Sequence, residues 1–313
     1  KNSFIFESVE KGKIKGRYSV LGIKPDLVWK CQNKKCSIKK IFKGKESIIN
    51  EEDISPIKSL KKLFSRNKFK IPDNLPPMSS GLFGYLGYDM IKYFEKIDLK
   101  NEDDLKLPES IFVRPTIMLI FDNVSDKLFI IKTIWPNQIS ANRTFELSKK
   151  EVNTILKIIE KPIKLKSNNY IKRNDNHSNL FKGVKSNINF SEFKQMVKNA
   201  KEYIFSGDIF QVVLSRRFRK KIKTSSLSIY RALRFLNPSP YLFYMNFNDF
   251  SIVGSSPEIL VKLNDNTVTI RPIAGTRKRG KNHTEDLKLE KDLLSDPKEL
   301  AEHLMLLDLG RND

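Results

Sequence analysis

Residues 296–313 read DPKELAEHLMLLDLGRND, and this stretch carries the strongest local signal in the chain. Asp296 is of the type that caps helices, Pro297 suits the first helical position, and Gly310 suits the position after the last turn. The stretch therefore predicts a helix that ends at Gly310. Its buried stripe is expected to consist of Leu300, Leu304 and Leu307.

Two carboxylates lie on this predicted helix. Glu299 and Glu302 are three residues apart and share a face, from which their oxygens could hold a hard cation. His303 lies next to them. The same spacing also fits a solvated acidic face, so the pattern alone leaves both interpretations open.

Short apolar runs bounded by turn signals precede this helix. Asn264-Asp265-Asn266 separates two of them and predicts a hairpin, because Asn and Asp tolerate turn conformations. Upstream, Ser191 is a good N-cap for a helix, and Gly207 suits its C′ position. This half therefore predicts a mainly antiparallel sheet with packed helices. The expected strands are 209–214, 241–247, 251–254, 259–263 and 268–272.

The first half of the chain shows the same alternation of apolar runs and turns, and then a segment with apolar residues at helical spacing. A polar stretch rich in Lys, Asn and Ser follows and predicts a linker. The fold class is therefore α+β. The expected strands are 18–23, 112–121 and 128–134, and the expected helix is 146–159. The expected organisation is an N-terminal domain at 1–165, a linker at 166–189 and a second domain at 190–313.

Composition narrows the class of protein. The 313 residues include 58 Lys and Arg against 36 Asp and Glu, which gives a formal net charge of +22. No run approaches the roughly 18 apolar residues of a membrane span, so no membrane partner is expected. The lysines are scattered, and no nucleic-acid motif accompanies them, so we expect no nucleic-acid partner. A non-catalytic polyanion-binding protein stays open as an alternative from another class.

The cysteine content favours a reducing environment. Cys31 and Cys36 have four residues between them and no His nearby, which is too few ligands for a zinc site. We therefore expect two free thiols and a cytoplasmic protein.

Two further segments could carry chemistry. Residues 273–277, IAGTR, end a predicted strand with small residues, a hydroxyl and the cation of Arg277, which suits contacts to a substrate carboxylate. Glu258 stands at another strand junction, where a semi-buried carboxyl could act as a general acid. An ordinary polar turn and a plain surface Glu are the alternatives.

Seven segments together carry a resemblance. They agree in type and order with anthranilate synthase component I, a family of chorismate-utilising enzymes of tryptophan biosynthesis, over nearly the whole chain. The resemblance implies a lyase that converts chorismate and ammonia to anthranilate and pyruvate with Mg²⁺. The segments are 6–8 (FES), 81–89, 207–218 (GDIFQVVLSRRF), 237–244 (NPSPYLFY), 254–258 (GSSPE), 271–277 (RPIAGTR) and 296–313.

The resemblance also implies roles for particular residues. Glu302 would be a direct Mg²⁺ ligand, and Glu299 would support the metal through water. Gly275 and Thr276 would contact chorismate. Glu258 would protonate the C4 hydroxyl as it leaves.

Regulation and partners follow from the same resemblance. The family takes ammonia from a glutamine amidotransferase subunit, and tryptophan inhibits it by feedback. The residues that match the tryptophan site are Ser8, Pro240, Tyr241 and Leu242, the last in place of a Met that is common there.

Members of the family continue beyond the motif at 310–313 and supply further catalytic and metal-binding residues there. The resemblance therefore implies a fragment that is incomplete at both ends, truncated within the catalytic fold and inactive alone. Aminodeoxychorismate synthase component I is the nearest alternative. Many of its members have Lys where this chain has Ala274.

Overall fold

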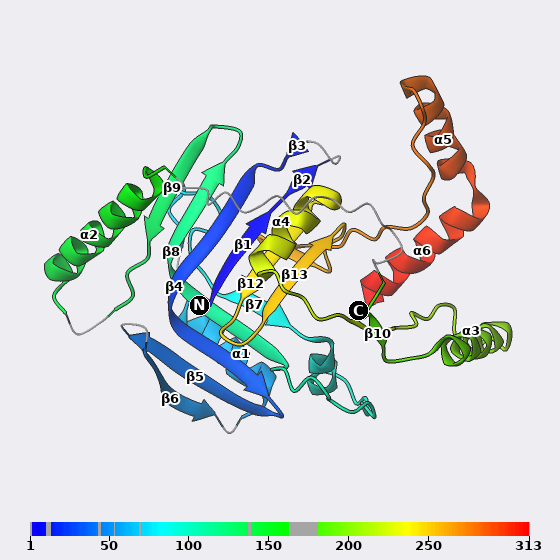
Figure 1. Cartoon of the computed structure of the whole chain (residues 1–313), viewed down its shortest axis with the longest axis horizontal. Coiled ribbons are helices and arrows are strands. Elements are labelled where there is room, and N and C mark those ends of the chain that lie inside the picture. Colours follow the sequence, from blue (N-terminus) through cyan, green and yellow to red (C-terminus); the bar gives the residue numbers. More distant parts are fainter. Residues whose placement is uncertain are drawn as a thin grey trace. The chain divides into compact units, whose positions relative to one another are not determined.

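The computed structural model describes residues 2–10, 14–42, 45–52, 54–68, 70–136, 139–162 and 181–312. Its main feature is a nine-stranded sheet in which every pairing is antiparallel (Figure 1). The α+β prediction is therefore confirmed. The strands are β1 (Ser3–Glu7), β4 (Tyr18–Gln32), β5 (Lys35–Phe42), β6 (Lys45–Glu52), β7 (Phe83–Leu86), β8 (Ser110–Asp122), β9 (Lys127–Lys132), β12 (Tyr241–Asn246) and β13 (Ser251–Ser256).

Helices and small hairpins complete the described elements. None of these helices combines the length and the apolar composition that a membrane span requires. The helices are α1 (Pro56–Arg66), the 3₁₀-helix η1 (Tyr88–Tyr93), α2 (Ala141–Ile159), α3 (Phe190–Phe205), α4 (Ser226–Leu236), α5 (His283–Ser295) and α6 (Pro297–Asn312). The hairpin strands are β2 (Val9–Glu10), β3 (Ile14–Lys15), β10 (Lys185–Ser186), β11 (Phe218–Arg219), β14 (Lys262–Asn264) and β15 (Thr267–Thr269).

Two long strands, β4 and β8, hold the sheet together. On one edge β4 pairs with β8, and on its other edge it pairs first with β1 and then with β5. A register shift between Pro25 and Leu27 separates these two parts of β4. Because such irregularities bend a strand, the sheet can continue in two directions, as β1-β12-β13 and as β5-β6.

Alternate residues of β4 pack into separate cores, as the two-residue period of a strand dictates. Leu27, Trp29 and Cys31 belong to a cluster that includes α1, whereas Val28 belongs to one built with β1 and β8. Trp29 is fully buried, and its Nε1 donates to Ser59 Oγ of α1 at 2.8 Å.

The two cysteines face each other across β4 and β5. Cys31 and Cys36 are register partners, and both are buried free thiols, as predicted. Burial and the neighbouring Cys36 raise the pKa of the Cys31 thiol far above its usual value, with the hydrogen bond to Cys36 the larger cause.

Most predicted strands are present. The runs at 241–247 and 251–254 form β12 and β13, and those of the first half lie in β4, β8 and β9. The predicted hairpin connects β14 and β15, with Asp265 (φ 45°) and Asn266 (φ 65°) both in the left-handed region. The flanking runs give strands of only three residues each.

The predicted strand at 209–214 is wrong. This segment lies among the described residues and is not a strand, and Phe210 and Val213 are 88% and 86% exposed. An apolar run becomes a strand only where a free sheet edge is available to pair with it.

The described chain divides into two compact units, one of residues 1–161 and 226–313 and the other of residues 162–225. This division differs from the predicted boundaries, which grouped 190–313 in one domain. The physical reason is that β12 pairs along its length with β1 and so joins the sheet of the first half. Of the predicted linker, residues 166–180 lie outside the described residues.

Helix α3 of the smaller unit begins earlier than predicted. Asn189, not Ser191, is the N-cap, because its side chain accepts from the Glu192 backbone while the Glu192 carboxylate accepts from the Asn189 backbone. Gly207 follows the C-cap with φ 81° and confirms the prediction for the helix end.

Helix α6 begins at Pro297 as predicted, but it continues through Gly310 to Asn312. Gly310 marks a close approach instead of an end, since a Cβ there would lie 2.8 Å from Ile270 Cδ1. The predicted buried stripe is also wrong, because α6 has α5 as its main helical neighbour within the described residues. The three leucines are 42%, 62% and 45% exposed, for Leu300, Leu304 and Leu307.

Candidate functional site

Glu258 and the segment 273–277 lie together after strand β13. The backbone N–H of Ile273 donates to Glu258 Oε1 at 3.1 Å, and Ser256 Oγ donates to the Glu258 carbonyl at 3.0 Å. Glu258 is exposed, which agrees with the surface position that the sequence left open as the alternative to a semi-buried one. It lies just beyond the end of β13, outside the sheet. Its second carboxyl oxygen has no hydrogen-bond partner among the residues that the structure describes.

Gly275 brings the same segment against helix α6. Its φ is 52°, and a Cβ at this position would lie 2.6 Å from Glu299 Oε2 and 3.0 Å from Leu293 Cδ1. Both the left-handed backbone conformation and the close approach of the Glu299 and Leu293 side chains therefore favour glycine. The predicted substrate contact and the predicted metal ligand are thus direct neighbours.

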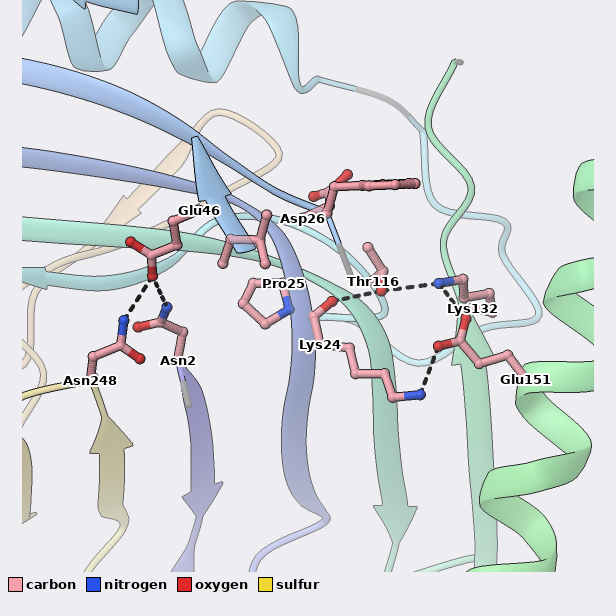
Figure 2. Close-up of a pocket in the computed structure, with 11 residues that line it drawn as sticks. Asn2, Lys24, Pro25, Asp26, Glu46, Thr116, Lys132, Glu151 and Asn248 are labelled. Carbon is pink, nitrogen blue, oxygen red and sulfur yellow. Dashed lines mark hydrogen bonds and ion pairs between the residues drawn. The ribbon is translucent and has the colours of Figure 1, made fainter. Parts of the chain in front are cut away.

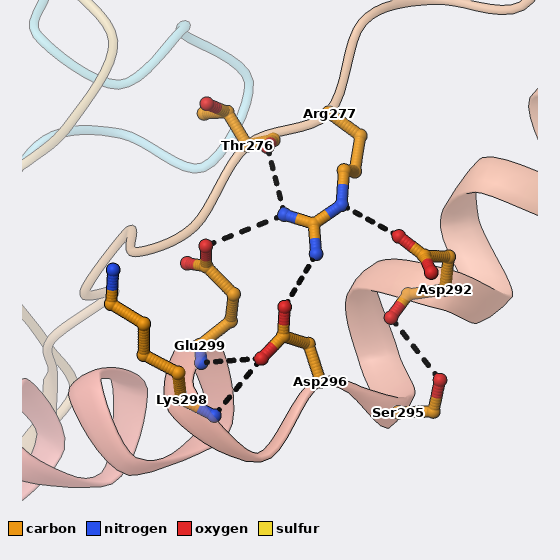
Figure 3. Close-up of polar contacts among 7 residues, drawn as sticks. All are labelled: Thr276, Arg277, Asp292, Ser295, Asp296, Lys298 and Glu299. Carbon is orange, nitrogen blue, oxygen red and sulfur yellow. Dashed lines mark hydrogen bonds and ion pairs between the residues drawn. The ribbon is translucent and has the colours of Figure 1, made fainter.

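Arg277 is the centre of an ionic cluster at this place (Figure 3). It donates to Asp292 at 2.7 Å, to Asp296 at 2.7 Å and to Glu299 at 3.3 Å. These contacts, with Asp292 the largest cause, raise the pKa of Arg277, and the arginine in turn lowers the pKa of Asp296. The sequence assigned this cation to a substrate carboxylate, whereas the structure pairs it with three carboxylates of the chain.

Asp296 also begins helix α6. Its Oδ1 accepts from the backbone N–H groups of Lys298 at 3.0 Å and Glu299 at 3.5 Å, which confirms its predicted capping role. Glu302 is half-buried and forms no side-chain hydrogen bond or ion pair with the described residues. We call Glu258, residues 273–277, Glu299 and Glu302 the strand-end site.

Glu299 and Glu302 are the residues of the strand-end site that could hold a magnesium ion, as one that keeps most of its water. Among the described residues no three His, Cys, Asp or Glu side chains converge as a complete metal cage. Magnesium is commonly held by one or two carboxylates together with substrate oxygens, and Glu299 and Glu302 supply such a pair on one face of α6. Glu299 Oε1 is held by Arg277, so a metal there would have to share or replace this contact.

A separate cavity of about 590 Å³ gathers the four residues matched to tryptophan binding, Ser8, Pro240, Tyr241 and Leu242. We call it the Ser8 cavity. The walls meet because β1 pairs with β12 in a register that places Glu7 opposite Leu242. Its apolar lining comes from Phe6, Tyr18, Val20, Met78, Phe243 and Met245. That tryptophan binds there stays a prediction.

Two charged residues that line the Ser8 cavity, Glu7 and Arg17, are held by residues outside the cavity. Glu7 accepts from Tyr230 Oη at 2.6 Å and pairs with Arg234 Nε at 2.9 Å, which ties β1 to helix α4. Burial and the bond to Glu7 raise the pKa of Tyr230. Arg17, which the sequence did not single out, lines the cavity and pairs with Asp122 at 3.2 Å.

The β12-β13 hairpin connects the Ser8 cavity to the strand-end site. Tyr241 of the cavity wall is the register partner of Ser256, and Leu242 is that of Ser255. Ser256 in turn bonds to the Glu258 carbonyl. The cavity wall is therefore connected to the predicted acid through the pairing of Tyr241 with Ser256 and the two residues that follow Ser256.

A second cavity, of about 850 Å³, lies at the bend of the sheet and contains none of the predicted site residues (Figure 2). Lys24 and Lys132 each approach Glu151 of α2 at 2.8 Å, and Lys132 Nζ donates to Thr116 Oγ1 at 3.1 Å. The lysines lower the pKa of Glu151 despite its burial. No sequence motif signals this network, because its members come from four separate elements.

Comparisons with known proteins agree with the resemblance. The profile of a family described as chorismate binding enzyme matches residues 1–313. Anthranilate synthase component 1 from Cereibacter sphaeroides is 41% identical over 100% of this chain and 61% of its own length. The protein of the same name from Aquifex aeolicus is 39% identical over 99% of this chain and 61% of its own length.

A solved structure extends this similarity to the fold. The crystal structure of anthranilate synthase component I from Streptococcus pneumoniae matches with a TM-score of 0.74 and 32% identity. The match covers 95% of this chain and 61% of that chain. The chain thus spans about three fifths of the length of the curated relatives it matches.

Proposed function

The chain belongs to the family of chorismate binding enzymes, and on that basis we propose that it is the large component of an anthranilate synthase. The observation that carries the proposal is the match over the whole of this chain, at 36–41% identity, to curated relatives named anthranilate synthase component 1. The adjacency of Glu258, Gly275 and Glu299 supports it, because these are the positions that the resemblance assigns to acid, substrate and metal.

The proposed reaction makes one aromatic product. Ammonia forms a bond to ring carbon C2 of chorismate while the C4 hydroxyl leaves as water, with its proton supplied by Glu258. The ring then loses its proton at C2 as the C3–oxygen bond breaks, and the ring becomes aromatic. The enolpyruvyl group takes up a proton at its methylene carbon and leaves as pyruvate. Chorismate and ammonia thus give anthranilate, pyruvate and water, and the proton lost by Glu258 is regained as the added nitrogen gives up a proton.

The strand-end site would hold the substrate by its carboxylate. The backbone at Gly275 and the hydroxyl of the exposed Thr276 offer hydrogen-bond donors in the non-strand segment that follows β15. Glu302, with Glu299 in support, would hold Mg²⁺, which neutralises the substrate carboxylate and withdraws electrons from the ring. Arg277 keeps the segment against α6 throughout.

The wider setting is also part of the proposal. A glutamine amidotransferase subunit would supply the ammonia in the cytoplasm, as the first step of tryptophan biosynthesis. Tryptophan would inhibit from the Ser8 cavity, which has apolar walls for an indole and polar groups at Ser8 and Arg17. Its separation from Glu258 by one strand pairing offers a route for inhibition.

Product analysis of the full-length enzyme tests this proposal. With chorismate, ammonia and Mg²⁺ we expect anthranilate and pyruvate in equal amounts, measured by mass spectrometry and a coupled pyruvate assay. Ala274 presents no nucleophile, so ammonia itself can reach the ring. Accumulation of 4-amino-4-deoxychorismate without pyruvate would instead identify an aminodeoxychorismate synthase.

Replacing Ser8 with Phe tests the regulatory cavity. The ring should fill the space that tryptophan would occupy, so in the full-length enzyme we expect at least about a tenfold rise in the tryptophan concentration needed for half inhibition. Uninhibited activity should stay near the wild-type value. Ser65→Phe on the exposed face of α1 is the control. Unchanged tryptophan sensitivity of S8F would place the inhibitor elsewhere.

A further inference from the structure

Arg277 connects three elements that the proposed reaction needs in one place. It follows Gly275 and Thr276 directly, and it binds Asp292 of α5 and Glu299 of α6. Its third partner, Asp296, is the residue between the two helices. The guanidinium therefore fixes the substrate segment to the helix that carries the metal carboxylates.

The three contacts of Arg277 are unequal. Asp292 and Asp296 each accept at 2.7 Å, whereas Glu299 accepts at 3.3 Å. Glu299 is thus the most weakly held partner, and it can leave without depriving the guanidinium of its two short bonds. A planar guanidinium with five donors is suited to such multiple pairing, which a lysine cannot reproduce.

The charges around Arg277 favour an exchange of partners. Three carboxylates surround one guanidinium, so the cluster has an excess of negative charge. Glu302, which lies one turn along α6, adds another carboxylate on the same face. A divalent cation would be attracted to this face, while the positive charge of Arg277 beside Glu299 opposes it.

We propose that Arg277 is a positioning residue that holds Glu299 until a divalent cation takes over its carboxylate. Arg277 then stays on Asp292 and Asp296 and keeps Gly275 and Thr276 in place for the substrate. This inference rests on the proposed function, because it takes the cation to be the Mg²⁺ of that reaction.

Calorimetric titration of the full-length protein with MgCl₂ tests the exchange. Arg277→Gln removes the competing charge, so we expect Mg²⁺ to bind about fivefold more tightly than in wild type. In the Glu299→Gln background the same change should give no gain, because the contested carboxylate is absent. Arg277→Lys keeps the charge and should leave the affinity near that of wild type. Arg279→Gln, which removes an exposed arginine paired with Asp286 at 2.7 Å, is the matched control.

Steady-state kinetics at saturating Mg²⁺ provide the second readout. Loss of Arg277 should raise KM for chorismate about tenfold and leave kcat nearly unchanged, since the segment is less ordered but the acid is intact. Unchanged or weaker Mg²⁺ binding by R277Q would overturn the inference, as would an equal gain in the E299Q background. If E299Q and E302Q themselves bind Mg²⁺ like wild type, the proposed metal site fails instead.

Discussion

Replacing Glu302 with Gln should lower Mg²⁺-dependent anthranilate formation by the full-length enzyme about 100-fold or more. Gln keeps the shape and the helix propensity of Glu but loses the charge that holds a hard cation. The side chain has no hydrogen-bond or ion-pair partner among the described residues, so α6 should remain folded. Anthranilate fluorescence as a function of Mg²⁺ concentration measures the effect.

The matched control for this substitution is Glu290→Gln. Glu290 is an exposed carboxylate of the neighbouring helix α5, so it reports any general effect of removing one negative charge. The activity of the Glu290→Gln enzyme should be close to that of wild type. Near-normal activity of E302Q at ordinary Mg²⁺ would show that Glu302 does not hold the metal.

The sequence predicted correctly those elements whose structure depends on residues adjacent in the chain. Asp296 and Pro297 begin α6 as expected, because a cap and a fixed φ act within one turn. Asp265 and Asn266 form the expected hairpin for the same kind of reason. Such features need no knowledge of distant residues.

Long-range packing explains the failures. A glycine at position 310 is expected both where a helix ends and where another side chain approaches the backbone closely, so the sequence does not distinguish the two. In the structure Ile270 approaches Gly310. The pairing of β1 with β12 places Glu7 opposite Leu242. The spacing of apolar residues in either segment does not reveal which strand it pairs with. That pairing places β12 in the sheet of the first half, whereas the predicted organisation grouped residues 190–313 together.

The candidate site was foreseen mainly through the resemblance, residue by residue. The resemblance assigned roles to Gly275 and Glu299 separately, but only the structure shows that a Cβ at one would strike the carboxylate of the other. Arg277 was noted as a cation, and its three partners follow 15, 19 and 22 residues later. Ionic clusters of this kind depend on how two helices meet, which spacing alone does not specify.

Glu258→Gln should lower kcat about 100-fold to 10,000-fold, the usual contribution of a positioned general acid. The amide can still accept the Ile273 N–H, which donates to Oε1 at 3.1 Å, so the segment that holds the substrate should stay in place. KM for chorismate should therefore change little while the chemical step slows. Stopped-time product assays at saturating chorismate, ammonia and Mg²⁺ give kcat.

A leaving group of altered basicity separates a proton donor from a structural residue at this position. If Glu258 donates the proton to the C4 oxygen, a chorismate analogue whose C4 substituent leaves without protonation should react with E258Q and wild type at similar rates. If Glu258 serves only to anchor Ile273, E258Q should slow neither the analogue nor chorismate, because the amide still accepts the Ile273 N–H. Because the Ile273 contact uses one carboxyl oxygen and the proton transfer would use the other, the two roles predict opposite outcomes for the same variant.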